Sequence, residues 1–357
     1  MTFAEHSATP SSVDRALQQV TSFPRLRYMG SKYRLARPLA EVFEQSGGGT
    51  AVDAFSGSGV VSYLLKAQGY RVVSNDFLAF PTAIAEAVVV NQSERLSDEL
   101  IARIAGEPLD DRDFIASTFD GLYFDADDRH FLDSAWSHID LLVGAERALA
   151  ISALVLSAAR KQPRGVFTFT DSSRYDDGRR DLRLTLREHF VERAAEYNAA
   201  VFDRGAGHLA QCGDVTELAV ADPSLVYLDP PYAPPSDDAD YMNRYHFLEG
   251  LSVYWRGVEI MAETKTQKIA KRYTPFAYKR SIEDALSRTF EKFEDAGAIV
   301  LSYSSNALPD AGRIEELLRE VKPVVEVQSI DHRYSFGTHA GATRRSASEY
   351  LFIGRDR

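Results

Sequence analysis

Residues Asp229, Pro230, Pro231 and Tyr232 combine a carboxylate, two prolines and an aromatic ring directly after the apolar run 225–228. The apolar run predicts a short buried strand, and the two prolines must end it in a rigid, extended loop. Such a loop can present the Asp229 carboxylate and the Pro230 carbonyl as two acceptors, with the Tyr232 ring beside them. Two acceptors and a flat face suit an exocyclic amine on a planar heterocycle, although a proline-rich strand exit without chemistry has the same composition.

A second group of residues surrounds a glycine-rich turn. Residues 50–55 read as a buried strand, and the segment that ends it contains Asp53, Phe55, Gly57 and Gly59. Glycines let the backbone approach a ligand closely, but no Gly-Lys-Ser/Thr follows, so the segment does not fit a Walker loop. Asp76 ends the next predicted strand, 17 positions after Gly59, where a Rossmann-like acid meets a ribose diol. An adenosine-type cofactor is therefore favoured, with a tight turn and a strand-end cap as the plain alternatives.

Two further segments are weak signals of a binding site on their own and count only together with the motifs above. Tyr28, Gly30 and Lys32 bring a ring, a flexible backbone and a cation to a ligand with a carboxylate, although a surface turn has the same composition. Asp214 adds an acid near the same strand ends, and Cys212 beside it is expected to be a small buried residue rather than a nucleophile.

The predicted elements place these residues at strand ends. Strand 50–55, helix 60–68 and strand 70–76 form a βαβ unit, which implies a parallel sheet. The other predicted elements are helical segments at 77–156 and 182–202, part of a hairpin at 165–170, a strand at 225–228, a helix at 283–296, a strand at 298–303 and a terminal hairpin of 324–327 with 350–354. The chain reads as one α/β core interrupted by a largely helical insertion.

Composition bounds the class of protein. The chain has 357 residues and a net charge of −11, which argues against a nucleic-acid partner unless the basic residues cluster. They do cluster: residues 264–282 hold six Lys or Arg and no acid, whereas residues 107–140 hold ten acids and two arginines. No segment has the apolar length of a membrane helix or a signal peptide. The single cysteine excludes an intrachain disulfide and a cysteine metal site, so a cytoplasmic protein without a metal is predicted.

The order of the motifs resembles that of a known family. Segments 28–32, 53–59, Asp76, Asp214 and 229–232 look like the successive motifs of the Dam-type, or D12-class, adenine-specific DNA methyltransferases. The resemblance spans about residues 25–232, with a weaker match at 301–304. It implies a Rossmann-like methyltransferase core with a mixed, mostly parallel seven-stranded sheet, and S-adenosyl-L-methionine as cofactor.

The resemblance also implies roles for individual residues. The cofactor would lie across the carboxyl ends of the strands and contact Tyr28, Lys32, Asp53, Phe55, Gly57, Gly59, Asp76, Asp214 and Asp229. Among these, Asp76 would bind the ribose, Asp214 would lie near the cofactor's adenine, and Asp229 would lie where the cofactor meets the target amine.

The family pattern divides the chain into a lead-in, a core and an insertion. Residues 1–24 are expected to be a loosely ordered lead-in, 25–80 and 206–357 the catalytic core, and 81–205 the target-recognition insertion. Segment 233–282 is longer than a minimal member needs. Its aromatic stretch 241–247 and its basic stretch are expected to add DNA contacts, which leaves the recognised sequence open.

The predicted reaction is methyl transfer to the N6 amine of an adenine flipped out of duplex DNA. Hydrogen bonds to Asp229 and Pro230 would favour a pyramidal, nucleophilic nitrogen, and Tyr232 would stack on the base. A C5-cytosine enzyme is excluded because Cys212 lacks the setting of its nucleophile. The sequence leaves open an amine methyltransferase acting on RNA or on cytosine N4, an NAD-type oxidoreductase, a non-catalytic nucleic-acid-binding relative, the oligomeric state and a cognate restriction endonuclease.

Overall fold

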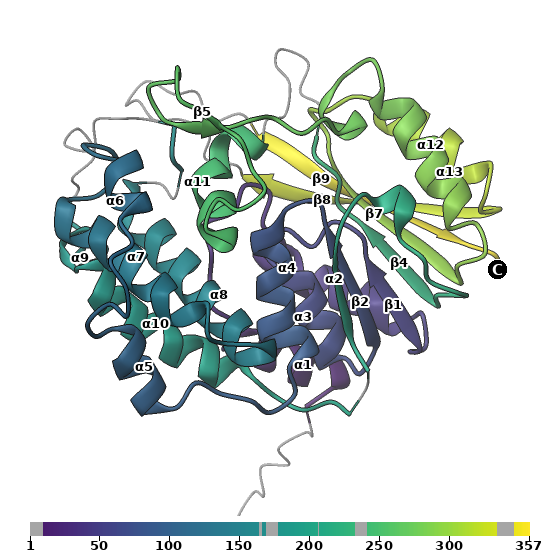
Figure 1. Cartoon of the computed structure of the whole chain (residues 1–357). Helices are drawn as coiled ribbons and strands as arrows, with labels where there is room; N and C mark the ends of the chain where they lie inside the picture. Colours follow the sequence, from purple (N-terminus) through teal and green to yellow (C-terminus); the bar gives the residue numbers. More distant parts are fainter. Residues whose placement is uncertain (1–9, 164–165, 169–177, 206, 233–240, 334–345) are drawn as a thin grey trace, which may run out of the picture.

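The computed structural model describes residues 10–163, 166–168, 178–205, 207–232, 241–333 and 346–357. Its main feature is a seven-stranded sheet with the order β3-β2-β1-β4-β7-β9-β8 (Figure 1). The strands are β1 (Thr50–Asp53), β2 (Arg71–Asp76), β3 (Leu209–Cys212), β4 (Leu225–Leu228), β7 (Ala298–Ser304), β8 (Val324–Arg333) and β9 (Ser346–Arg355). Only β9 pairs antiparallel with its neighbours, so the expected mixed, mostly parallel sheet and the terminal hairpin are confirmed.

Both faces of the sheet are buried, which explains why its strands read as nearly continuous apolar runs. Ala51, Leu225 and Tyr227 contact one buried cluster, and Val52 and Val226 contact another on the opposite face. The helices that cover the two faces are α1 (Ser12–Val20), α2 (Ala36–Glu44), α3 (Val60–Ala67) and α4 (Ala79–Ala85) on the first, and α12 (Ile282–Lys292) and α13 (Ala311–Arg319) on the second.

The strand order reverses between β1 and β4, and this brings the two main motifs together. Val52 pairs with Val226 and Asp53 with Tyr227, so the glycine turn and the Asp-Pro-Pro-Tyr loop leave the sheet side by side. The N–H of Ala54 also donates to the Tyr227 carbonyl (3.1 Å). Ligands of open α/β sheets bind at such a reversal, beyond the carboxyl ends of the strands.

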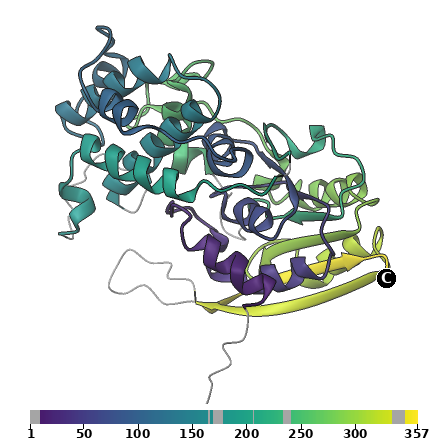
Figure 2. The ribbon, with the colours of Figure 1, turned by 90° about the horizontal axis from the view of Figure 1, so that it is seen from below.

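A group of helices lies beside the sheet. It comprises α5 (Asp98–Ile104), α6 (Phe114–Thr118), α7 (Ala126–Ile139), α8 (Gly144–Lys161), α9 (Arg180–Arg183) and α10 (Leu186–Ala200). In Figures 1 and 2 these blue to teal helices gather on one side, away from the yellow C-terminal strands. Their apolar side chains belong to the same buried cluster as one face of the sheet. The helical group is therefore packed on the core rather than suspended from it.

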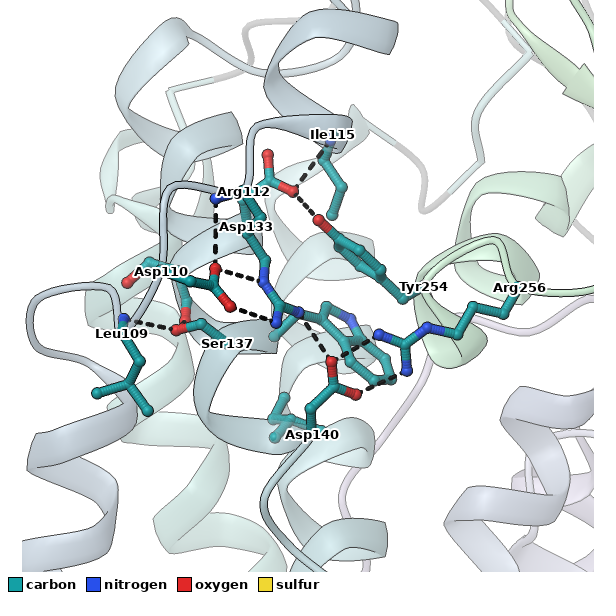
Figure 3. Close-up of polar contacts among 12 residues, drawn as sticks. Leu109, Asp110, Arg112, Ile115, Asp133, Ser137, Asp140, Tyr254 and Arg256 are labelled. Carbon is teal, nitrogen blue, oxygen red and sulfur yellow. Dashed lines mark hydrogen bonds and ion pairs between the residues drawn. The ribbon is translucent and has the colours of Figure 1, made fainter.

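Helix α11 (Tyr241–Val253) packs against this helical group. At its C-terminal end, the Tyr254 hydroxyl donates to Asp133 Oδ1 (2.6 Å), and Arg256 donates to both oxygens of Asp140 (2.7 and 2.6 Å) (Figure 3). Arg112 also donates to Asp140 (2.9 Å). Asp133 and Asp140 come from α7 and the residue after it, so α11 ends in a polar network with that helix. The small sheet of β5 (Ile260–Met261) and β6 (Lys268–Ile269) follows.

Four local expectations need correction or restriction. Residues 12–20, expected in a loose lead-in, form the amphipathic helix α1, which buries Val13, Ala16 and Val20; residues 1–9 lie outside the described residues. Strand β3 was not predicted, because its Leu-Ala-Gln-Cys sequence contains no β-branched residue and lies at the sheet edge. For the same reason Cys212 is exposed rather than buried.

The expected hairpin at 165–170 lies largely outside the described residues, and its described part, 166–168, forms no strand. None of the helices in the described ranges has the length and apolar character needed to cross a membrane.

Candidate active site

A cleft lies beyond the carboxyl ends of β1, β2 and β4. It encloses about 910 Å³ of empty space, part of which is open to solvent. Seven residues expected from the sequence line it: Tyr28, Lys32, Phe55, Gly57, Asp76, Asp229 and Pro231. Four motifs that are separated in the chain thus meet in one cavity.

Asp229 belongs to a polar cluster at one end of this cleft. The Lys32 Nζ lies 2.8 Å from Asp229 Oδ1 and 3.2 Å from Glu349 Oε1, and it donates to the Tyr232 hydroxyl (2.7 Å). The Tyr232 hydroxyl oxygen lies 2.8 Å from Asp229 Oδ1 and 2.5 Å from Glu349 Oε1, so its single proton is donated to one of these two carboxylates at a time. Ser302 Oγ also donates to Glu349 (3.0 Å). Lys32 and Glu349 are almost fully buried, so the cluster holds Asp229 in a fixed orientation.

Burial and neighbouring charges shift the pKa values in this cluster. Burial raises the pKa of Asp229 to about 6; Lys32 opposes this rise and the Glu349 charge adds to it. Burial disfavours the charge on Lys32, but the two carboxylates together raise the pKa of its ammonium group. Burial also raises the pKa of Tyr232 well above its usual value. At neutral pH, Lys32 is a cation and Tyr232 a hydroxyl donor beside an ionised Asp229.

The glycine turn requires glycine at two positions. Gly57 has φ +49°, and a Cβ there would lie 2.8 Å from the Tyr28 ring; Gly59 has φ +82°, and a Cβ would lie 3.0 Å from Ile84. Positive φ disfavours any residue with a side chain. The turn therefore packs directly against Tyr28, and Gly59 opens helix α3 without itself lining the cleft.

Asp76 ties this turn to the end of β2. Its Oδ2 accepts from the Gly57 N–H (2.7 Å) and its Oδ1 from the Leu78 N–H (2.9 Å). Burial raises the pKa of Asp76 to about 6, while these backbone hydrogen bonds act in the opposite direction. Each carboxylate oxygen has two lone pairs, so Asp76 keeps an acceptor toward the cleft that it lines.

Two other predicted acids do not line the cleft. Asp53 is fully buried, accepts from Ser62 Oγ (2.6 Å), and within the described part of the chain its Oδ1 has no hydrogen-bond partner. Burial raises the pKa of Asp53 to about 7. Asp214 accepts from the N–H and the hydroxyl of Thr216 (2.8 and 2.7 Å), which caps a short turn. Pro230 and Tyr232 do not line the cleft either, and Tyr232 contacts the lining residue Lys32.

The sequence did not reveal how α11 supports the site. Tyr245 stacks on Tyr28 (centroids 4.8 Å apart, planes at 10°), and its hydroxyl accepts from the Met29 N–H (2.7 Å). Tyr245, His246 and Phe247 are buried, so this part of segment 241–247 packs inside the protein instead of contacting DNA as expected. Its aromatic composition gave the signal, but the packing partner is 216 residues away.

The basic segment closes the cleft near Asp76. Lys271 and Arg272 line the cleft, and the Arg272 guanidinium lies 4.5 Å from the centroid of the Phe77 ring. Arg272 also pairs with the buried Glu249 of α11 (3.0 Å), and the other oxygen of Glu249 accepts from the Ala79 N–H (2.8 Å). Glu249 thereby fixes Arg272 at the cleft.

Residues of the weaker match at 301–304, together with Glu349, which the sequence did not single out, complete the site. Ser302 and Tyr303, in the weakly matching segment of β7, contact Glu349 and the edge of the Tyr232 ring (5.0 Å between centroids, 64°). Within the described ranges, no group of His, Cys, Asp and Glu side chains could hold a metal ion.

Comparison with known proteins supplies the family. Residues 28–274 match the family described as D12 class N6 adenine-specific DNA methyltransferase. The Type II methyltransferase M2.HphI of Haemophilus parahaemolyticus is 26% identical over 349 residues, which cover 94% of this chain and 98% of that protein. The modification methylase LlaI of Lactococcus lactis subsp. lactis is 22% identical over 340 residues, and StsI of Streptococcus sanguinis is 23% identical over 337. Each alignment covers 86% of this chain but only 51% and 48% of those relatives, so the chain spans about half their length.

Proposed function

Because the chain belongs to the D12 class of N6 adenine-specific DNA methyltransferases, we propose that the cleft binds S-adenosyl-L-methionine and that segment 229–232 receives an adenine flipped out of duplex DNA. Membership in this class favours adenine in DNA over the RNA, cytosine N4, oxidoreductase and non-catalytic alternatives. The names of the relatives, a type II methyltransferase and two modification methylases, support the further proposal of a cognate restriction endonuclease.

The lining of the cleft fits this cofactor. A sulfonium cation is favoured by the Tyr28 ring through cation–π attraction and by the Asp229 carboxylate. Asp76 offers an acceptor to a ribose diol, and the Phe55 and Phe77 rings offer apolar surface to a nucleoside. When bound, the cofactor supplies an electrophilic methyl group. We assign Gly57 and Gly59 to the backbone cradle, and Asp53 and Asp214 to its support.

The observation that supports this reaction most directly is the hydrogen bonding of the Asp229 carboxylate. Lys32 and Tyr232 both contact its Oδ1, and no residue in the described part of the chain donates to its Oδ2. Oδ2 is therefore the acceptor that remains for a target amine, with the Pro230 carbonyl as the second. Two accepted hydrogen bonds draw the N6 lone pair out of conjugation with the ring, and the fixed carboxylate stabilises the positive charge that develops on nitrogen.

The remaining catalytic roles follow from this arrangement. Lys32 and Glu349 are positioning residues, because they hold Asp229 and Tyr232 through buried hydrogen bonds. Pro231 lines the cleft and keeps the loop extended, and the Tyr232 ring is proposed to stack on the adenine. We further propose that insertion 81–205 reads the target sequence and that 25–80 with 206–357 forms the catalytic core.

Transfer of a tritiated methyl group to duplex DNA, single-stranded DNA and RNA tests this function. The wild type is expected to label N6-methyladenine in the duplex, and Asp229→Asn to bind cofactor normally but lose at least about 100-fold in rate, the order of magnitude for removal of one preorganised transition-state contact. Label only in RNA, label on cytosine, or equal rates for both proteins would contradict the proposal.

A further inference from the structure

A second hollow adjoins the cleft on the far side of the Tyr28 to Ser31 segment. Tyr28, Gly30 and Ser31 line both hollows, so this segment forms the wall between them. Four arginines line the second hollow: Arg25, Arg27, Arg34 and Arg160. Acidic residues are absent from its described lining. We call this hollow the arginine groove.

The groove lies between two parts of the fold. Arg25, Arg27 and Arg34 come from the segment around the first motif, and Arg160 comes from the C-terminal end of α8. It thus lies where the catalytic core meets the helical group, and it shares Tyr28, Gly30 and Ser31 with the cleft.

Arg25 and Arg34 contrast with the arginines of the polar network at the end of α11. Arg112 and Arg256 are neutralised by close carboxylates (Figure 3). Arg25 and Arg34 are exposed, and neither forms an ion pair with an acid in the described ranges. Arg160 has only a long contact with Asp181 (3.7 Å), and its buried Nε has no hydrogen-bond partner among the residues described.

The shape of Arg25 favours a particular ligand. Its guanidinium lies 4.4 Å from the centroid of the Tyr33 ring, so this contact restricts where the group can point. A guanidinium positioned beside an aromatic ring is suited to contact with a phosphate. On a chain with a net charge of −11, exposed arginines such as Arg25 and Arg34, which form no ion pair in the described ranges, give a local positive surface that a polyanion can find.

We propose that the arginine groove binds the phosphodiester backbone of the DNA substrate next to the target adenine. The inference rests on the proposed function and specifies where the DNA runs. The backbone passes from the cleft over the wall at Tyr28 and along Arg25, Arg34 and Arg160, and it stays away from the acidic surface of residues 107–140. These contacts position the duplex and carry no sequence information.

Salt-dependent DNA binding tests this path. Fluorescence anisotropy with a labelled duplex measures Kd between 50 and 300 mM NaCl for the wild type, for the double variant Arg25→Gln/Arg34→Gln, and for the charge-matched control Arg288→Gln/Arg319→Gln. The control arginines are exposed on α12 and α13 and already pair with Asp284 and Glu315. A third variant, Arg25→Lys/Arg34→Lys, keeps the charge of the groove.

Loss of two phosphate contacts should reduce the slope of log K against log salt by about 1.8 and weaken binding roughly 10- to 30-fold near 150 mM salt. The control and the lysine variant should keep the wild-type slope, and all four proteins should have similar Tm values. Equal slopes for the groove variant and the control would overturn the proposal. So would a wild type that does not bind the duplex, or a groove variant that loses cofactor binding alone.

Methyl transfer by the wild type is measured in parallel, so that the two proposals fail separately. Salt-dependent binding through the groove without methylation of adenine counts against the proposed function only. Methylation of adenine with unchanged slopes counts against the groove only.

Discussion

The charge on Glu349 should determine the pH above which the rate of methyl transfer rises. One oxygen of its carboxylate and one of Asp229 lie 2.5 and 2.8 Å from the Tyr232 hydroxyl oxygen, so these two carboxylate oxygens are at most 5.3 Å apart. At an effective dielectric constant of about 20, two charges at this distance repel by about 3 kcal/mol, or roughly two pKa units. This repulsion contributes to the raised pKa of Asp229, about 6.

Glu349→Gln removes the charge and retains an oxygen that can accept from Lys32 and Tyr232. The pKa of Asp229 should then fall, and its ionised form, which accepts from the target amine, should persist to lower pH. The rise of the single-turnover rate at the acidic side of its pH profile, which we call the acid limb, should move to lower pH by about one to two units. The shift is smaller than the full repulsion would give, because the Lys32 charge shields the two carboxylates from each other. Rates of tritiated methyl transfer between pH 5 and 9 measure the limb.

Two controls make the result specific. Ser302→Ala removes a hydrogen bond to Glu349 without removing charge, and should leave the limb near its wild-type position. Asp229→Asn should abolish the limb together with most of the rate. An unchanged limb in Glu349→Gln, or a limb that moves to higher pH, would refute the electrostatic reasoning.

Three further predictions concern cofactor binding and stability. Gly57→Ala should weaken cofactor binding at least about tenfold, as measured by calorimetry, because its Cβ would meet the Tyr28 ring. The control Gly69→Ala, also at positive φ but with open space around its Cβ, should lower Tm slightly and leave cofactor binding unchanged. Equal cofactor binding by the two variants would contradict this prediction. The pKa of Asp53 is raised to about 7, so the folded protein favours the protonated carboxyl. The stability that this protonated form contributes is complete below the unfolded pKa and is lost as pH rises through about 7. Asp53→Asn should therefore raise Tm about 2–4 °C more at pH 8 than at pH 5, and a pH-independent gain would be evidence against it. The pKa of Asp140 is lowered to about 2, mainly by its hydrogen bond with Arg256. The stability that the ionised carboxylate contributes is therefore present above the unfolded pKa and is lost as pH falls toward 2. Asp140→Asn should lower Tm by about 3–6 °C at pH 7 and by less at pH 3, whereas equal losses at both pH values would contradict the prediction.

The sequence predicted those parts of the site that follow from strand ends. Parallel strands end at one edge of a sheet, so the identification of strands at 50–55, 70–76 and 225–228 was enough to bring Gly57, Asp76 and Asp229 together. It could not predict the direction of a side chain after the strand: Asp53 and Asp214 have the expected type but turn toward Ser62 and Thr216.

Contacts between residues far apart in the sequence could not be predicted from the pattern of residue types. Glu349 is a fully buried acid within the apolar strand β9, and an acid in such a run was a usable signal, but nothing in the sequence names Lys32 as its partner. Arg272 and Glu249 both lie in the segment recognised as unusually long, yet only packing joins them to Phe77. The edge strand β3 was missed because its residues lack the β-branched, apolar character of a central strand.

Helix α11 has a consequence for exchanging specificity between related enzymes. One end of it holds Tyr28 through Tyr245, and the other is fixed to α7 through Tyr254 and Arg256. If the helices between residues 98 and 200 read the target sequence, as proposed, a graft of that continuous stretch alone would separate Asp133 and Asp140 from their partners. The transplantable unit is discontinuous: it consists of the helical group together with residues 241–256.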